Sequence, residues 1–176
     1  IEFQTIDLVT TAIGKIKSLV PAQADKFQFQ SNLMYYSSVI NAEAFLQTIK
    51  NLPGQIEKDP KQMLDLANTI EKSYSSEVKL LTAIEKLLNQ SMSNAPTIEQ
   101  KFALARIYVL NNKTDKAYKL LDESISDGKN QNMDVTLIEQ FKLKLGKSWY
   151  LFINTSENKL RQKNKAAVRS KVVLQL

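Results

Sequence analysis

Residues 97–127, TIEQKFALARIYVLNNKTDKAYKLLDESISD, carry the clearest structural pattern in the chain. Asn111 and Asn112 divide this stretch into two parts, because asparagine tolerates the left-handed backbone that ends a helix. The helix predicted before the break has one wide apolar face, made of Ile98, Phe102, Leu104, Ala105, Tyr108 and Val109. Thr114 or Asp115 can cap the helix predicted after the break. The apolar face of this second helix consists of Ala117, Leu120, Leu121, Ser124 and Ile125.

Two helices joined by so short a connection must lie antiparallel, so the stretch predicts a helical hairpin. The small residues Ala105 and Ala117 allow the two backbones to approach closely. Composition extends this expectation to the whole chain, since 176 residues contain only four Gly and four Pro, and strand-like alternation is nowhere sustained. With 43% hydrophobic residues, the chain can bury a sizeable core. We therefore predict an all-α protein whose helices form a single domain.

Apolar residues spaced three or four apart predict further helices on both sides of this hairpin. They cover residues 2–20, 22–40, 42–52, 60–74 and 78–90, followed by a long last helix that begins near residue 134. Ile40 and Val78 are among the apolar residues whose spacing marks these helices.

The breaks between these helices are predicted from turn and capping residues. Asn41 is expected to cap one helix, and Asp59 followed by Pro60 is expected to begin another. Residues 52–60 are predicted to form a loop without regular structure, because they contain two prolines and a glycine. Residues 127–132 are predicted to form a polar connection that contains Gly128.

The net charge of +6 is concentrated at the end of the chain. Residues 157–176 contain a single acid, Glu157, and six basic residues: Lys159, Arg161, Lys163, Lys165, Arg169 and Lys171. Residues 1–156 are therefore nearly neutral, which disfavours nucleic acid as a partner of the helical body. We divide the chain into a helical-repeat domain, residues 1–156, and a basic C-terminal tail, residues 157–176, which we interpret first as a disordered, solubilising or cloning-derived segment. Binding of nucleic acid or of an anionic membrane through this tail is a weaker alternative.

The chain contains no Cys and no His. Thiol nucleophiles, disulfides, the usual zinc sites and every Ser-His-Asp arrangement are therefore excluded. The acidic residues are scattered singly over polar helix faces, so we expect no catalytic residues, no metal site and no cofactor. No apolar run approaches the ~20 residues that span a bilayer. A chain without Cys is compatible with an exported protein and equally with a cytoplasmic one.

A repeat emerges when the hairpin is laid over the chain at a shift of 34 residues. Three Tyr and Ala pairs stand nine residues apart, namely Tyr35 and Ala44, Tyr74 and Ala83, and Tyr108 and Ala117. A period of this size predicts stacked helical pairs. If the pairs mark equivalent places, Ala83 and Ala117 lie at helix contacts, where leucine would overpack the core.

At these positions the sequence resembles the tetratricopeptide repeat family. The best match is residues 97–127, through Leu104, Ala105, Tyr108, Ala117, Leu121 and Ser124. Residues 60–91 and 31–50 match in part, with Glu71 where the family has a small residue, and the family's usual Trp and Pro are missing. The resemblance implies antiparallel helix pairs stacked as a right-handed superhelix. Glu139 falls at another small position, so the long last helix is expected to cap the array.

Partners of this family usually lie in the groove lined by the first helix of each pair. The resemblance therefore implies a non-catalytic scaffold or adaptor that binds a protein or peptide. By helical phase, the groove residues are Asn68, Lys72, Glu99, Phe102 and Arg106. Asn68, Lys72 and Arg106 can hold a peptide backbone or a carboxylate. Trp149 is a further candidate for partner binding, because it and Tyr150 cannot both face one core.

The main alternative is an accessory helical domain of a larger enzyme or of a thioredoxin-like envelope protein. Degenerate helical pairs of a similar kind follow thioredoxin-like domains in some bacterial envelope proteins, although this chain has no Cys-x-x-Cys. Such a domain would hold a substrate or mediate dimerisation. The chain opens at Ile1 without Met, so we expect that it derives from a longer protein, in which a catalytic or anchoring part could precede it.

Overall fold

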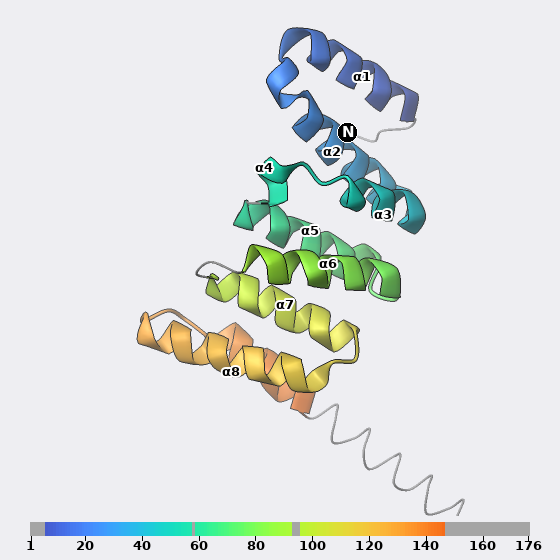
Figure 1. Cartoon of the computed structure of the whole chain (residues 1–176). Helices are drawn as coiled ribbons and strands as arrows, with labels where there is room; N and C mark the ends of the chain where they lie inside the picture. Colours follow the sequence, from blue (N-terminus) through green and yellow to red (C-terminus); the bar gives the residue numbers. More distant parts are fainter. Residues whose placement is uncertain (1–5, 58, 93–95, 147–176) are drawn as a thin grey trace, which may run out of the picture. The chain divides into compact units, whose positions relative to one another are not determined.

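The computed structural model describes residues 6–57, 59–92 and 96–146, and the regular elements in these ranges are all α-helices (Figure 1). They are α1 (Ile6–Leu19), α2 (Pro21–Ser38), α3 (Ala42–Lys50), α4 (Gly54–Glu57), α5 (Pro60–Ser73), α6 (Val78–Ser91), α7 (Ile98–Leu110) and α8 (Thr114–Asn130). Residues 136–146 are helical as well. The prediction of an all-α fold is confirmed.

The described residues fall into two compact units, one that ends at residue 127 and one that begins at residue 128. Within the first unit, α1 packs on α2 and α2 on α3, while α5, α6 and α7 contact one another (Figure 1). The predicted domain of residues 1–156 and tail of residues 157–176 stay predictions, because residues 147–176 lie outside the described residues.

Side-chain caps begin several of the helices, as the sequence predicts. Asn41 accepts a hydrogen bond from the backbone amide of Ala44 at 3.1 Å and thereby caps α3. Asp59 accepts from two amides in the first turn of α5, where Pro60 is the first residue. A proline there costs nothing, because its missing amide would have no helical partner. Caps of this kind typically contribute about 1 kcal/mol each.

The second helix of the predicted hairpin, α8, begins earlier than expected. α8 begins at Thr114, and the amide of Ala117 donates to the carbonyl of Lys113 at 3.1 Å. Lys113 therefore holds the capping position, and the prediction of Thr114 or Asp115 there was wrong. The break itself is confirmed, because Asn112 adopts the left-handed backbone with φ 57°.

Three helix ends share one left-handed geometry. Ile40, Asn112 and Asn132 have φ angles of 51°, 57° and 55°. In each case the next amide reaches back five residues, from Asn41 to Tyr36, from Lys113 to Tyr108 and from Met133 to Gly128, at 3.0, 2.8 and 2.8 Å. This bond satisfies a carbonyl that the helix end would otherwise leave free. Ile40 was predicted to lie in the helix of residues 22–40, but α2 ends at Ser38, and Ile40 follows it with 68% exposure.

Replacing Ile40 with Asn is expected to stabilise the protein by about 1 kcal/mol. Residues with a Cβ lose roughly 1–2 kcal/mol in the left-handed region, whereas asparagine compensates by local hydrogen bonding. The exposed isoleucine side chain offers little burial in return. Urea unfolding measures the difference. Val39→Asn is the matched control, because Val39 is 50% exposed but has an ordinary φ of −94°. A lower midpoint for Ile40→Asn than for the parent protein would contradict this account.

The core of the first unit is centred on α7, which is buried on most of its circumference. Its buried residues are Ile98, Gln100, Ala103, Leu104, Ala105, Ile107 and Tyr108. The sequence predicted one apolar face that included Phe102 and Val109, yet both are only half-buried. The single-face prediction was wrong because α7 contacts both α5 and α6, and each contact needs apolar side chains on a different side.

Three further expectations differ from the structure. Residues 54–57 form the one-turn helix α4 inside the predicted loop, because Ile56 is buried at 2% exposure and anchors the segment. Val78 is 69% exposed, since it is the first residue of α6 and precedes the buried stripe. The predicted connection of residues 127–132 is largely helical, because α8 continues through Gly128 to Asn130.

The tyrosines of the predicted repeat are packed but have different partners. Tyr74 is 2% exposed, and its hydroxyl donates to the Tyr36 carbonyl at 2.6 Å. Tyr108 is 8% exposed, and its hydroxyl donates to the Asn89 side chain at 3.3 Å. Tyr35 is only half-buried and lies edge-on to Tyr36. The hydroxyls of Tyr74 and Tyr108 therefore connect neighbouring helices in two different ways.

Candidate functional site

Arg106 on α7 brings three of the predicted groove residues together. Its Nη2 donates a hydrogen bond to the Asn68 Oδ1 on α5 at 2.7 Å. Its guanidinium carbon lies 5.0 Å from the centre of the Phe102 ring, one helical turn earlier. A cation over an aromatic ring is stabilised by the negative face of the ring. Asn68, Phe102 and Arg106 therefore lie together in the structure.

A carboxylate that the sequence did not place in the site also contacts Arg106. Glu71 on α5 lies with its Oε2 3.2 Å from the Arg106 Nη1. The side chains of Arg106 and Glu71 are 25% and 33% exposed, so this ion pair is partly screened by water. The Arg106 Nε is buried without a hydrogen-bond partner among the described residues. The guanidinium is thus held in a fixed plane with part of its hydrogen-bonding capacity unused.

Lys72 supplies a second positive charge on the same helix as Asn68. It lies one turn after Asn68 on α5, and its side chain is exposed. Within the described part of the chain, Lys72 forms none of the ion pairs that the structure shows. The last predicted binding residue, Trp149, lies outside the described residues.

A cleft of about 400 Å³ lies between α2 and α5 in the same unit. It is lined by Gln30, Leu33 and Met34 of α2 and by Gln62, Asp65 and Thr69 of α5. Gln30 and Gln62 are hydrogen-bonded to each other across it at 3.2 Å. One side of α5 therefore lines this cleft. Asn68 and Glu71 on the same helix contact Arg106.

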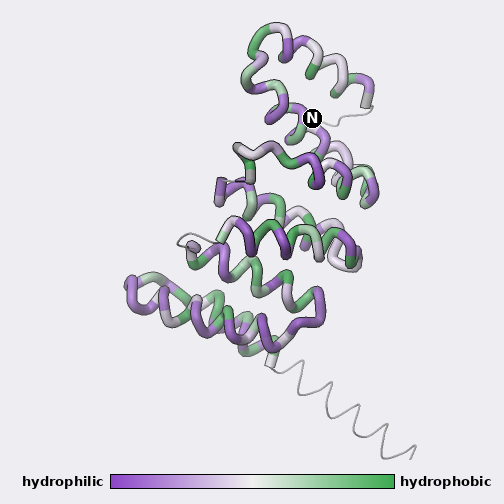
Figure 2. Tube along the Cα trace, viewed as in Figure 1, coloured by the Kyte–Doolittle hydropathy of each residue, from purple (hydrophilic) through white to green (hydrophobic). Residues whose placement is uncertain are grey.

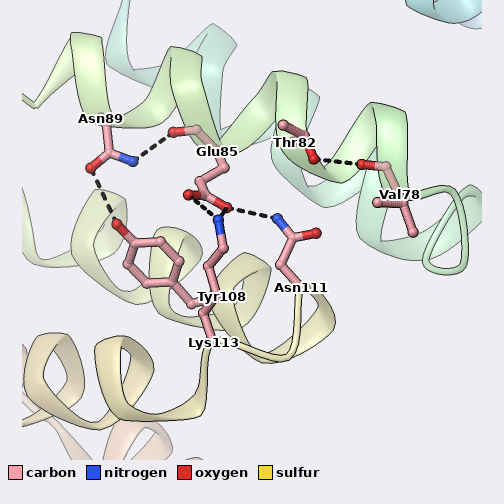
Figure 3. A network of polar contacts seen from close by, with 7 residues as sticks. All are labelled: Val78, Thr82, Glu85, Asn89, Tyr108, Asn111 and Lys113. Carbon is pink, nitrogen blue, oxygen red and sulfur yellow. Dashed lines mark hydrogen bonds and ion pairs between the residues drawn. The ribbon is translucent and has the colours of Figure 1, made fainter.

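A second polar cluster connects α6 to the turn between α7 and α8 (Figure 3). Glu85 accepts hydrogen bonds from Lys113 and from the Asn111 side chain, all at 2.7 Å, and its own side chain is only 14% exposed. Asn89, one turn later on α6, donates to the Glu85 carbonyl and accepts from Tyr108. Glu85, Asn89, Tyr108, Asn111 and Lys113 each have a polar partner within the cluster, so we interpret it as a structural cluster that fixes the turn.

The ionisable groups with shifted pKa values lie away from the Arg106 cluster. Burial raises the pKa of Tyr74. Hydrogen bonds from the Thr136 side chain and backbone lower the pKa of Asp134, which is fully exposed. Both groups have structural partners, since Tyr74 bonds a carbonyl of α2 and Asp134 bonds the amide of Thr136.

Neither metal ligands nor a membrane span is evident in the described part of the chain. The described residues contain no group of three or more His, Cys, Asp or Glu placed to hold a metal ion. Apolar and polar residues alternate along the described helices (Figure 2), and none of these helices is long and apolar enough to cross a membrane.

Sequence reasoning missed Glu71 and Glu85, although one signal was available. Glu71 occupies a position where the repeat pattern asks for a small residue, and an acid there can reach the arginine of the next helix. Glu85 gives no such signal, because its partners Asn111 and Lys113 follow it by more than twenty residues. Comparisons of the chain with models of protein families, with curated proteins and with solved structures found no match.

Proposed function

We propose that this chain is a non-catalytic scaffold or adaptor that binds a protein or peptide partner in a groove on α5 and α7. The observation that carries the proposal is the Arg106 cluster. The Arg106 guanidinium on α7 is oriented by Asn68, Glu71 and Phe102. Lys72, whose side chain is exposed, lies on the neighbouring helix α5. Two cations and an amide on adjacent helices suit a carboxylate, which accepts several charge-assisted hydrogen bonds at once.

Helix packing supports a tetratricopeptide-like array as the framework of this groove. α2 packs on α3 and α5 on α6, which gives two consecutive helix pairs. α5 also packs on α7, and α3 on α6, so that first helices meet first helices and second helices meet second helices. Such stacking of pairs produces an extended surface along the first helices, and repeat proteins use surfaces of this kind for binding. In this proposal α7 and α8 form the third pair.

The electrostatics favour a partner with an acidic side chain or a free C-terminus. Glu71 already compensates part of the Arg106 charge, so the partner's carboxylate would compete with Glu71 or pair with Lys72. Phe102 contributes an apolar surface beside the charged groups, and it is half-buried. An acidic residue flanked by an apolar one therefore matches the chemistry of this groove.

Deleting residues 157–176 is expected to leave partner binding in place. The proposed groove lies wholly on α5 and α7, whereas the deletion removes the basic tail. Tagged full-length and shortened proteins would be used to capture partners from the source organism. The captured partners would then be titrated against both proteins at low and at moderate salt.

The two forms should bind with affinities that differ by less than about threefold at moderate salt, because surface charges at a distance are screened there. Loss of all captured partners from the shortened form would refute the proposal. A steep dependence of the lost affinity on salt would then point to counterion release at the tail.

A further inference from the structure

We infer that a cleft between α2 and α3 is a second binding site, and that it takes the main chain of an extended peptide. This cleft has a volume of about 630 Å³. The polar residues that line it are Asp25, Gln28, Asn32, Tyr36, Gln47, Thr48 and Asn51. None of them belongs to the Arg106 cluster, so the inference goes beyond the proposed function and does not depend on it.

Amide side chains form two rows along this cleft. Gln28 and Asn32 stand four residues apart on α2, and Gln47 on α3 stands four residues before Asn51, the residue that caps the C-terminal end of α3. Residues four apart lie on the same face of a helix, one above the other. The cleft therefore has a pair of amides on each wall.

The two walls differ in what they can offer to a ligand. Gln28 and Asn32 form no hydrogen bond within the described part of the chain, so each presents a donor and an acceptor. On the α3 wall, Gln47 donates to Glu43 at 2.9 Å and Asn51 donates to the Gln47 carbonyl at 3.0 Å. These bonds fix the α3 amides and leave their side-chain oxygens to accept. The α2 wall can thus both donate and accept, while the α3 wall mainly accepts.

A peptide main chain matches this arrangement in chemistry and in spacing. Each peptide unit has one donor and one acceptor, like the side chain of Asn or Gln. Four residues of helix rise by about 6 Å, and two residues of an extended chain by about 6.6–6.8 Å. Successive amides on one wall can therefore meet every second residue of an extended peptide. The apolar residues Phe29, Ala44 and Pro53 complete the lining.

Other classes of ligand fit the cleft less well. A phosphate or a nucleic acid needs cations, and Asp25 is the one charged residue of the lining. A sugar ring needs an exposed aromatic face, but Phe29 is only 5% exposed and Tyr36 is packed against Tyr35 with 5.3 Å between ring centres. The Asp25 carboxylate instead favours a lysine or arginine side chain at one end of the peptide.

The direct probe is a library of hexapeptides with acetylated N-termini and amidated C-termini. In each sublibrary one position is fixed and the other positions are mixed. The readout is the side-chain NH₂ resonances of Gln28 and Asn32 in a nuclear magnetic resonance titration. We expect saturable shifts with most sublibraries, since the main chain is common to all, and a preference for Lys or Arg at one end. The same library with alternate peptide nitrogens methylated should bind at least about tenfold more weakly, because it lacks half of the donors.

Variants separate this site from the proposed groove. Gln28→Ala combined with Asn32→Ala should weaken library binding by about tenfold, as followed through the side-chain NH₂ resonances of Gln47 and Asn51. Gln23→Ala is the matched control, because Gln23 is an exposed glutamine on α2 outside the cleft, and it should leave binding unchanged. Lys72→Ala should also leave it unchanged. Equal binding of the methylated library would overturn the inference. Shifts produced by a linear glucose hexasaccharide but by no peptide, or shifts with neither, would overturn it as well.

Discussion

Replacing Ala117 with Leu is expected to lower the free energy of unfolding by about 1–3 kcal/mol. Ala117 is completely buried on α8, as are Leu121 and Ser124 on the same helix. Leucine adds three carbon atoms at a position that is inaccessible to solvent, so neighbouring side chains must leave their preferred rotamers. Alanine and leucine have similar helix propensities, which means that the change reports packing and not helix formation.

The same replacement at Ala83 should behave differently. The sequence placed Ala83 and Ala117 in equivalent positions, but Ala83 is only half-buried. It borders a cleft of about 320 Å³ between α3 and α6, next to Ile49, Leu52 and Leu87. A leucine there can extend into the cleft, so we expect a change in stability within about 0.5 kcal/mol.

Urea unfolding of the two variants and of the parent protein measures both effects. A large loss for Ala117→Leu and a small change for Ala83→Leu would support the packing described for α6 and α8. Equal losses at both positions would instead support the equivalence that the sequence suggested. Unchanged stability for both would mean that neither alanine lies at a tight helix contact.

Local sequence signals predicted the helix boundaries well where a capping residue acts alone. The predicted roles of Asn41 and Asp59 are both found, because their side chains need only the amides of the following turn. Gly128 shows the limit of such signals, since it lies inside α8 although glycine usually weakens a helix. Tertiary packing can outweigh so small a preference, and Gly128 is buried.

Burial was harder to predict than helix position. Periodicity assigns one apolar stripe to each helix, whereas α7 contacts α5 and α6 and is buried on several sides. Ile40 has the apolar character of a core residue, but the chain must turn after α2, and that turn places Ile40 in the left-handed region and in water. Both errors have one cause, because the number of neighbours around a residue depends on the tertiary arrangement.

The side-chain contacts around Arg106 were only partly predictable for a similar reason. Helical phase on α5 and α7 was enough to group Asn68 with Arg106, which are hydrogen-bonded in the structure. It could not reveal that Glu71 would pair with Arg106, because this contact depends on how far the two helices are shifted along each other. The amide-lined cleft was not predicted at all, since amides on α2 and α3 look like ordinary solvated helix surface in the sequence.

Replacing Lys72 and Arg106 together with Ala is expected to weaken partner binding by about 1–3 kcal/mol, or roughly 5- to 150-fold. The double variant removes both cations that can bind the partner's carboxylate, and the charge-assisted hydrogen bonds are lost with them. Replacing Lys61 and Lys79 with Ala is the matched control. Both are exposed lysines outside the Arg106 cluster, so the control removes the same total charge from other places.

Glu71→Gln should act in the opposite direction. Glu71 lies with its Oε2 3.2 Å from the Arg106 Nη1 and would compete with an incoming carboxylate. Glutamine keeps the size of the side chain but removes its charge, so Arg106 becomes more available. We expect tighter binding of a partner that presents a carboxylate and no gain for a partner whose carboxylate has been amidated.

The most direct test of the binding proposal is a calorimetric titration of a captured partner into the parent protein, the Lys72/Arg106 double variant, the Lys61/Lys79 control and Glu71→Gln. Urea unfolding of each variant verifies that it remains folded. The account predicts weaker binding only for the Lys72/Arg106 variant and tighter binding for Glu71→Gln. Unchanged affinity in the folded Lys72/Arg106 variant would contradict it and would show that the partner binds outside the groove on α5 and α7.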